Sequence, residues 1–486
     1  MARPNILFIQ TDSHDGRLFG AAGHPSMRGV TPNMDALAAA GTMFTTAYSN
    51  NPICCPCRAS MWSGQYTHHC EGWNNYKGLE PGTPTFRDEL DRAGYHTQTY
   101  GKTDYLSGAH TVRARVTAWL RSARIMKPTY REHLPNLWDH GQERIHVKDW
   151  EDVDRTAAFL AEAAKTPDRP FWLYLGIRAP HPGFTTNRRY WDQIDPDTIE
   201  IPPADTEDHP VTQYMRVSKN WEHGWDEAMS RRVRRTYFAM TAEVDAMVGA
   251  VLDALRQSPL ADSTYVIFTS DHGELAGEHE QYYKMNHYEA SARIPLIVTG
   301  PGVPAGQTVE APVTLVDMYP TLMDMAGLDR PEGLDGQSLM PAVAGDAGGL
   351  RDYAFSEYHD TACCTGSFML RRGDWKYIAY PGYAPQLFQL ADDPWEVRNL
   401  AAARPDVVAD MDGRLREIVD VDAVDAKVKA YDRASFAQWR DQQKAVGTYE
   451  TNMAVTHSGW TDITPETADP WTGDNEAQVA QWLAQG

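Results

Sequence analysis

The sequence is short of positive charge. Its 486 residues carry 45 Lys and Arg against 66 Asp and Glu, a formal net charge of −21. A surface of that sign repels nucleic acid and anionic lipid, which excludes a nucleic-acid binder and a protein built to lie on a membrane surface. A local basic pocket can still bind an anionic small molecule, because the charges nearest a ligand dominate the field that it meets.

Cysteine is scarce as well, and the apolar runs are short. The six cysteines include two adjacent pairs, Cys54–Cys55 and Cys363–Cys364, which is not the spacing of a disulfide framework. No apolar run approaches the ~18 residues of a membrane span. The run Asn5–Gln10 lies too early and is too short for a signal peptide. The sequence therefore predicts a cytoplasmic protein.

The first part of the chain alternates short apolar runs with helical patterns. This alternation predicts an α/β fold with a large mixed, mostly parallel sheet flanked by helices. Because the chain exceeds the size at which one core stops growing, we expect an α/β catalytic domain at residues 1–345 and smaller units after it. The runs expected as strands are 6–11, 96–100, 171–176 and 264–269, and a long helix is expected at 231–255.

The pattern changes after residue 345. Three runs, 353–358, 367–380 and 386–390, predict an antiparallel sheet, and a helix near 405–419 completes a subdomain at 346–425. The tail at 426–486 is polar but bears aromatic residues, which disordered tails lack. We therefore expect it to pack on the body or on a neighbouring subunit, which makes a homo-oligomer one of the outcomes. The aromatic residues are Tyr431, Phe436, Trp439, Tyr449, Trp460, Trp471 and Trp482.

Polar residues follow directly after four of the apolar runs. They are Asp12, Lys102, His181 and the pair Asp271–His272. In open α/β sheets ligands bind beyond the carboxyl ends of the strands, so we expect these residues on one rim. A lone Asp after a strand is more often a turn or cap residue, but an Asp-His-Gly triplet there favours a metal site. Carboxylates with one imidazole suit a divalent ion, calcium first, with manganese or another divalent ion as alternatives.

The run Cys54-Cys55-Pro56-Cys57-Arg58 is the densest group of reactive side chains. Pro56 suits the first turn of a helix, and Arg58 lies about one turn after Cys54. A side chain at the entry of that helix would lie in the positive field of its N-terminus, which favours an anion. Three other interpretations stay open: a Cys54–Cys57 redox pair, a zinc site that adds Cys70 and His68, and thiols that only pack.

The pattern Cys-x-Pro-x-Arg with a Ser-Gly turn after it resembles the signature of the sulfatase family, within the alkaline phosphatase superfamily. The resemblance covers nearly the whole chain and implies an alkaline-phosphatase-like fold and hydrolysis of sulfate monoesters. It also implies that a maturation enzyme oxidises Cys54 to formylglycine. Four segments resemble a branch that acts on glucuronate 2-sulfate, so a 2-O-sulfated uronic acid or an aryl sulfate is the expected substrate: Pro52–Pro56, Trp73–Asn75, Lys376–Tyr380 and Pro385–Phe388. Without the leader of a lysosomal enzyme, we expect a cytoplasmic bacterial relative.

The resemblance also implies roles for individual residues. Hydrated formylglycine has two hydroxyl groups: one attacks sulfur to give a covalent sulfo-enzyme, and deprotonation of the other expels sulfate. The family pattern implies His181 as general acid, with Lys284 as the alternative, and Arg58 and Lys102 as the residues that orient the diol. The implied metal ligands are Asp12, Cys54, Asp271 and His272, and the implied sulfate contacts are Lys102, His181 and Lys284.

The chain departs from the family pattern at three positions. Ser13 stands where a second carboxylate is common, Cys57 where Ser or Ala is usual, and Asp104 where a His commonly handles the proton of the diol. A phosphonate or phosphate ester hydrolase on the same scaffold remains an alternative, as does a binding protein that never matures Cys54. A uronate carboxylate needs a cation near the pocket, and the candidates by position are Arg17, His68, His69, Arg178 and Arg293.

Overall fold

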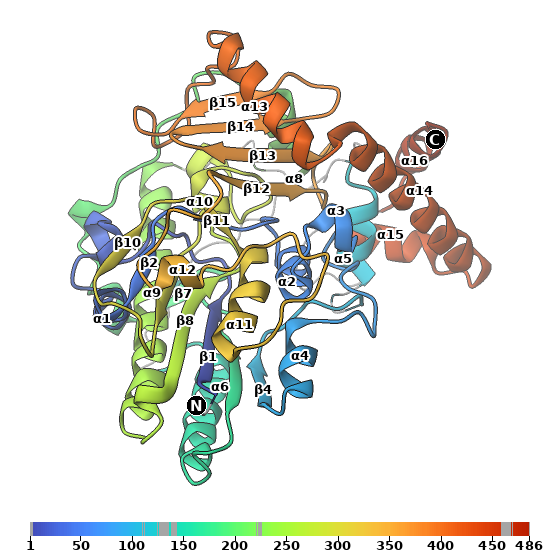
Figure 1. The fold of residues 1–486 in the computed structure, drawn as a ribbon. Helices are drawn as coiled ribbons and strands as arrows, with labels where there is room; N and C mark the ends of the chain where they lie inside the picture. Colours follow the sequence, from blue (N-terminus) through green and yellow to red (C-terminus); the bar gives the residue numbers. More distant parts are fainter. Residues whose placement is uncertain are drawn as a thin grey trace.

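The computed structural model describes residues 3–108, 110, 112–123, 125, 136–137, 143–219, 221, 226–457, 468 and 470–485. A seven-stranded sheet with helices on both faces forms the larger part of the molecule, and a four-stranded sheet lies at the end far from the N-terminus (Figure 1). Two layers of helix around a sheet let both sheet faces be buried. The predicted α/β fold with a C-terminal antiparallel sheet is confirmed.

The large sheet has the strand order β10-β2-β9-β8-β1-β6-β4. Its four longest strands are neighbours and run parallel, whereas β9 runs antiparallel to both β8 and β2. The sheet is therefore mixed but mostly parallel, as predicted. The strands are β1 (Asn5–Thr11), β2 (Thr42–Phe44), β4 (His96–Gly101), β6 (Phe171–Gly176), β8 (Thr264–Ser270), β9 (Leu296–Thr299) and β10 (Gln307–Val309).

Both faces of the large sheet are covered by helices, which explains why β1 is apolar at successive positions. Ile6 and Phe8 pack on one side with α2 (Cys54–Ser63), α4 (Phe86–Arg92) and α11 (Met318–Ala326). Leu7 and Ile9 pack on the other side with α1 (Pro32–Ala40), α6 (Val147–Ala163) and α9 (Glu227–Arg256). This packing fixes the ends of the parallel strands and the N-terminus of α2.

The C-terminal sheet is a four-stranded antiparallel meander in the order β12-β13-β14-β15. The run predicted at 367–380 is two strands, because a turn through Gly373, whose φ is +54°, reverses the chain. Helix α13 (Pro405–Ile418) packs against this sheet. The strands are β12 (Tyr353–Tyr358), β13 (Ser367–Arg372), β14 (Trp375–Ala379) and β15 (Gln386–Gln389).

The end of the chain forms helices α14 (Val421–Ala445), α15 (Tyr449–His457) and α16 (Gly473–Leu483). These helices lie beside α5 (Val112–Trp119) of the same chain (Figure 1). Their aromatic side chains, among them Phe436, Trp439 and Trp482, form one apolar cluster with it. Trp460 lies outside the described residues. The domain boundaries at 345 and 425, and self-association, stay predictions.

The remaining elements are short connections. None of the described helices has the length and apolar character needed to cross a membrane. The short strands are β3 (Ala47–Tyr48), β5 (Asn136–Leu137), β7 (Thr185–Thr186) and β11 (Val313–Thr314), and the other helices are α3 (Thr67–Cys70), α7 (Arg188–Trp191), α8 (Pro210–Lys219), α10 (Glu289–Ala292) and α12 (Met340–Val343).

Candidate active site

Four neighbouring parallel strands bring the polar strand-end residues to one rim. In the register, Thr11 of β1 pairs with Ser270 of β8, and Gly176 of β6 pairs with both Gln10 and Gly101. The residues that follow these pairs leave the sheet at the same level. The order β4-β6-β1-β8 therefore brings Lys102, His181, Asp12 and the pair Asp271–His272 from four distant segments to one edge, as the sequence pattern predicts.

Cys54 is the first residue of α2 and faces this rim. Its Sγ lies 3.3 Å from Nε2 of His272 and 3.6 Å from Oδ2 of Asp12, and the residue is 2% exposed. Asp12, Cys54, Asp271 and His272 each offer one ligand atom, and these four atoms lie within 4.8 Å of one another. The structure thus groups the four residues expected as metal ligands. Their donor set can hold a metal ion, since two carboxylates and an imidazole are buried together.

The protonation states in this group follow from burial. Burial, with the nearby charge of Asp12, raises the pKa of the Cys54 thiol. Burial also lowers the pKa of His272 to about 4, although Asp271 opposes this shift. Residue 54 as a thiol is therefore protonated at neutral pH and is a poor nucleophile. The imidazole of His272 is neutral, which is the form that binds metals.

Arg58 and Ser13 fix the two carboxylates of the group. Arg58 is fully buried, and its Nε donates to Oδ2 of Asp271 at 2.9 Å. Ser13 donates from Oγ to Asp12 at 3.0 Å and from its backbone N–H to Asp271 at 3.3 Å. Arg58 was expected to orient the diol, but its hydrogen bonds go to Asp271, Tyr174, Gln10 and the carbonyl of Lys102. The role of Ser13 was missed, because nothing in the spacing shows that a positive-φ serine bridges two loops.

Three further cationic or proton-carrying side chains surround the group. Burial opposes ionisation of Asp12, but Lys102, His181 and Lys284 together hold its pKa well below the ordinary value. Lys102 forms an ion pair with Asp12. Lys284 is 4% exposed, and none of the carboxylates in the described part of the chain forms an ion pair with it. A buried ammonium without a carboxylate partner favours an anionic ligand beside it.

His181 is neutral in this setting. Burial, and then the charges of Lys284 and Lys102, hold its pKa well below the ordinary value, while Asp12 opposes the shift. Because an imidazole beside two ammonium groups gains little from a proton, it becomes protonated only when an anion joins it. The same neighbourhood is therefore suited to an anion, whose negative charge would favour proton uptake by His181.

Asp104 lies beside Lys102, where its Oδ2 is 3.4 Å from the ammonium. Burial raises the pKa of Asp104, but His110 and Lys102 outweigh it and hold that pKa well below the ordinary value. Asp104 is therefore ionised and has no proton to give. Nε2 of His110 lies 3.3 Å from Asp104, which brings an imidazole next to the position where the family pattern has a histidine. Sequence reasoning missed His110, because its distance from Lys102 along the chain gives no signal.

The redox and zinc interpretations of the cysteine run gain no support in the described part of the chain. Cys54 and Cys57 are both free, and the Cys57 thiol donates to the backbone carbonyl of Asp271 at 2.9 Å. Nδ1 of His68 lies 2.8 Å from Glu357, and neither His68 nor Cys70 belongs to the metal-ligand group. Cys57 therefore supports the loop that carries Asp271.

A cavity of about 430 Å³ opens over the rim and is lined by Asp12, Lys102, Asp104, Arg178 and His181, among others. Of the five cations expected near a uronate carboxylate, only Arg178 lines this cavity. Its side chain is 43% exposed and is held by Asp149 and Asp152. The other candidates are engaged elsewhere: His68 and His69 pair with Glu357 and Asp335, and Arg17 and Arg293 line a second cavity.

Three features meet at the end of the parallel sheet: a buried group of cation ligands, a helix N-terminus, and a lysine without a carboxylate partner in the described chain. Together they suit a hydrolase of anionic esters. Residues 4–328 match a family model described as "Sulfatase". Residues 277–420 match a second model, "N-sulphoglucosamine sulphohydrolase, C-terminal". The chain belongs to the sulfatase family and is a sulfuric-ester hydrolase. The predicted resemblance, fold and reaction class are confirmed.

The chain is also similar to individual proteins. Arylsulfatase K of Bos taurus is 39% identical over 486 aligned residues, which cover 94% of this chain and 89% of that protein. The phosphonate monoester hydrolase of Agrobacterium radiobacter matches with a TM-score of 0.67 and 26% identity over 88% of this chain and 96% of that one. A protein in complex with its substrate, D-glucosamine-2-N,6-O-disulfate, has the same fold, with a TM-score of 0.69 and 22% identity over 86% of this chain and 99% of that one.

One expectation is corrected. A cytoplasmic protein with a bacterial relative was expected, but curated relatives such as the bovine and human arylsulfatases K are animal proteins. The expectation was wrong because the start of a given sequence carries no information about the organisms of its relatives.

Proposed function

We propose that this sulfatase acts through a formylglycine made from Cys54, with a calcium ion held by Asp12, Asp271, His272 and residue 54. The observation that carries the proposal is the position of Cys54, at the N-terminus of α2 and within 4.8 Å of the other three ligand atoms. A maturation enzyme that oxidises this cysteine is then a required partner. Hydrated formylglycine supplies a hydroxyl nucleophile and a second hydroxyl whose deprotonation regenerates the aldehyde.

The donor set supports a hard divalent ion once residue 54 is oxidised. With a thiol at position 54 the set includes a soft sulfur, whereas an oxygen there leaves two carboxylates, one oxygen and one imidazole. Such an ion supplies stabilisation of negative charge on oxygen. The chain's own contribution is to fix Asp271 through Arg58 and Asp12 through Lys102 and Ser13.

Lys284 and His181 are proposed to contact the sulfate ester. Lys284 offers a buried ammonium without a carboxylate partner in the described chain, and His181 lies close enough for its pKa to respond to Lys284. When the sulfate enters, its negative charge favours the protonated form of His181. The imidazolium can then donate its proton to the departing oxygen, which leaves as an alcohol.

For the substrate we propose a sulfated saccharide, specifically a 2-O-sulfated uronic acid. The neighbour of the same fold that takes a disulfated glucosamine supports a sulfated sugar, and the arylsulfatase K relatives support a sulfate ester. Arg178 at the cavity mouth would receive the carboxylate. The test is a set of disaccharides with a 2-sulfated uronate or a 6-sulfated glucosamine. Turnover of the glucosamine alone contradicts the uronate assignment.

Two measurements test the chemistry. The first is the mass of the intact protein. Conversion of Cys54 to formylglycine removes one sulfur and two hydrogens and adds one oxygen. A mass that shows an unmodified Cys54 in active protein contradicts the proposal.

The similarity to a phosphonate monoester hydrolase favours a second candidate function on the same site. Comparing kcat/KM for an aryl sulfate and an aryl phosphonate decides between them, and a preference for the phosphonate would support the second.

A further inference from the structure

The segment that carries Lys284 has an unfavourable backbone. This segment, residues 274–285, is called the Lys284 loop here and joins the Asp271–His272 pair to α10. Residues with a Cβ avoid the left-handed region because the side chain crowds the backbone. Six residues of the loop lie in that region: Ala276 (φ 44°), Gly277 (96°), His279 (55°), Glu280 (56°), Tyr283 (67°) and Met285 (88°). Such a loop keeps its shape only where contacts hold it.

The base of the Lys284 loop is held by its own atoms. Oε1 of Glu274 accepts the backbone N–H of Ala276 at 3.1 Å and of Tyr283 at 2.6 Å. The N–H of Leu275 donates to the carbonyl of Tyr283 at 2.6 Å. These bonds close the loop next to Lys284. At its far end the N–H of Met285 donates to the carbonyl of Pro52 at 3.1 Å, so the position of the middle of the loop depends on its other contacts.

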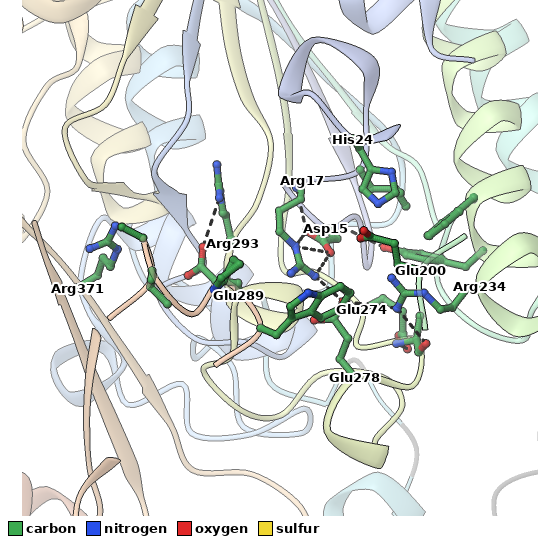
Figure 2. Close-up of a pocket in the computed structure, with 18 of the residues that line it drawn as sticks. Asp15, Arg17, His24, Glu200, Arg234, Glu274, Glu278, Glu289, Arg293 and Arg371 are labelled. Carbon is green, nitrogen blue, oxygen red and sulfur yellow. Dashed lines mark hydrogen bonds and ion pairs between the residues drawn. The ribbon is translucent and has the colours of Figure 1, made fainter. Parts of the chain in front are cut away.

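The middle of the loop is tied to the rim through Glu278. Its Oε1 lies 2.8 Å from Nη2 of Arg17 and 3.5 Å from Nη1 of Arg234 (Figure 2). Arg17 also binds Asp15 at 2.6 Å, and Asp15 lies three residues after Asp12 on the segment that leaves β1. The side chains of Glu278 and Arg234 are each 5% exposed. Glu278 thus connects the loop that carries Lys284 to the loop that carries Asp12.

A second contact holds the tip from another side. Asp205 accepts from Nδ1 of His279 at 2.6 Å, and Arg216 binds both Glu280 and Asp205 at 2.9 Å. Because this contact fixes the tip to the segment that precedes α8, the loop stays folded when the Glu278 contact is lost. What changes is its position relative to Asp12.

Glu278 borders a cavity of about 460 Å³, which is also lined by Asp15, Arg17 and Arg234 (Figure 2). Water in that cavity can hydrate the two guanidinium groups when the carboxylate is neutralised. Glu278→Gln keeps nearly the same side-chain volume and removes the charge that forms the tie. It also leaves Arg234, 5% exposed, without this carboxylate partner, so we expect a lower Tm as well.

We propose that Glu278 is a positioning residue that, through Arg17 and Asp15, holds the Lys284 ammonium at the distance from Asp12 at which it contacts the sulfate. The inference rests on the proposed contact of Lys284 with the sulfate. Because that contact is present both before and during reaction, its loss raises KM more than it lowers kcat.

The test measures inhibition by inorganic sulfate together with KM and kcat on an aryl sulfate, using the full-length matured enzyme. We expect Glu278→Gln to raise the sulfate inhibition constant and KM roughly tenfold or more, the loss typical of a charged hydrogen bond, with a smaller change in kcat. The double variant Glu278→Gln/Lys284→Met should bind sulfate no more weakly than Lys284→Met alone, since both changes remove the same contact.

Asp432→Asn is the matched control. Asp432 forms a buried ion pair with Arg121 at 2.7 Å in the α14 region, and its loss should leave the sulfate constant unchanged. If Glu278→Gln lowers Tm but leaves the sulfate constant unchanged, Glu278 is only structural and the inference is overturned. Additive effects in the double variant overturn it too. If Lys284→Met itself leaves sulfate inhibition unchanged, the proposed role of Lys284 has failed, and the inference falls with it.

Discussion

The rim and the second cavity contain the same kinds of charged side chain but balance them differently. In the second cavity each of three arginines has a carboxylate partner: Arg17 binds Asp15, Arg234 binds Glu278 and Arg293 binds Glu289. At the rim Lys284 has no carboxylate partner within the described chain. Paired charges hold segments in place, whereas an unpaired buried charge is costly unless a ligand completes it. The difference supports the proposal that the rim binds the anion and that the second cavity holds the surrounding segments in place.

The largest effect on kcat is expected from substitution of Cys54. Cys54→Ala removes the precursor of the nucleophile, and kcat should fall by roughly 10⁵-fold or more, as for other catalytic nucleophiles. The protein should still fold, since Ala fits the volume at the start of α2. The measurement is kcat on an aryl sulfate with circular dichroism as the control. Activity within ~100-fold of the parent would show that the rim works without this residue.

The variant His181→Gln tests whether His181 is the general acid whose protonation the neighbouring cations oppose. The pKa of His181 is lowered by burial and by Lys284, so its protonated form is depleted in the free enzyme as pH rises toward neutrality. A general acid must start protonated, so kcat/KM should decrease as pH rises above this lowered pKa toward neutrality. His181→Gln should lower kcat by ~10²–10⁴-fold and remove that slope.

The low pKa of Asp104 means that it stays ionised across the same range and does not produce the slope. If the decrease with pH persists in His181→Gln, the general acid is another group, with Lys284 next in line.

Arg58→Lys tests whether the contact of Arg58 with Asp271 holds the proposed metal ligands in place. Nε of Arg58 donates to Oδ2 of Asp271, and Nη2 lies 2.9 Å from the same oxygen. A lysine keeps the charge but not this geometry. Outer partners of metal ligands typically contribute 10–100-fold in affinity, so we expect a loss of about that size in calcium affinity. Titration of the metal-depleted enzyme with calcium, followed by Tm and by activity, measures it. An unchanged affinity would remove Arg58 from the support of the metal group.

The smallest functional effect is expected at Arg371, which takes no part in the Glu278 contact. This residue lines the second cavity and donates to the Tyr48 hydroxyl at 3.2 Å and to the carbonyl of Trp375 at 3.4 Å. Arg371→Met should lower the free energy of unfolding by about 1–3 kcal/mol, with kcat/KM unchanged. The neighbour Arg372, 40% exposed and paired with Asp352, is the control, and Arg372→Met should cost under about 1 kcal/mol. A loss of kcat/KM in Arg371→Met would break the distinction between the two regions.

Much of the fold and the rim was predictable, because both follow from local pattern. Apolar runs that end in polar residues predict β1, β6 and β8, and the rule on strand ends brings Asp12, His181 and Asp271 together. The Cys-x-Pro-x-Arg run predicts a helix start at Cys54, which α2 confirms. These signals are contained in single segments, so no knowledge of pairing is needed.

What was missed depends on contacts between distant segments. His110 reaches Asp104 through a loop whose path the sequence does not show. Arg17 was a candidate for a substrate carboxylate, yet it binds Asp15 and Glu278, and Glu278 lies 261 residues further along the chain. The antiparallel strand β9 was not predicted either, since short apolar runs do not reveal strand direction.

The order of the parallel strands also has a consequence for synthesis of the chain. Residue 54 leaves the ribosome well before β8 (Thr264–Ser270), the strand that brings Asp271 and His272 to the rim and buries Cys54. At ~5–20 residues per second, the roughly 200 intervening residues take about 10–40 s to make. Contacts that span so much of the chain also form slowly. During that interval the segment with Cys54 has not yet packed against the residues that follow β8. The proposed oxidation of Cys54 therefore competes with the pairing of β8 in the sheet.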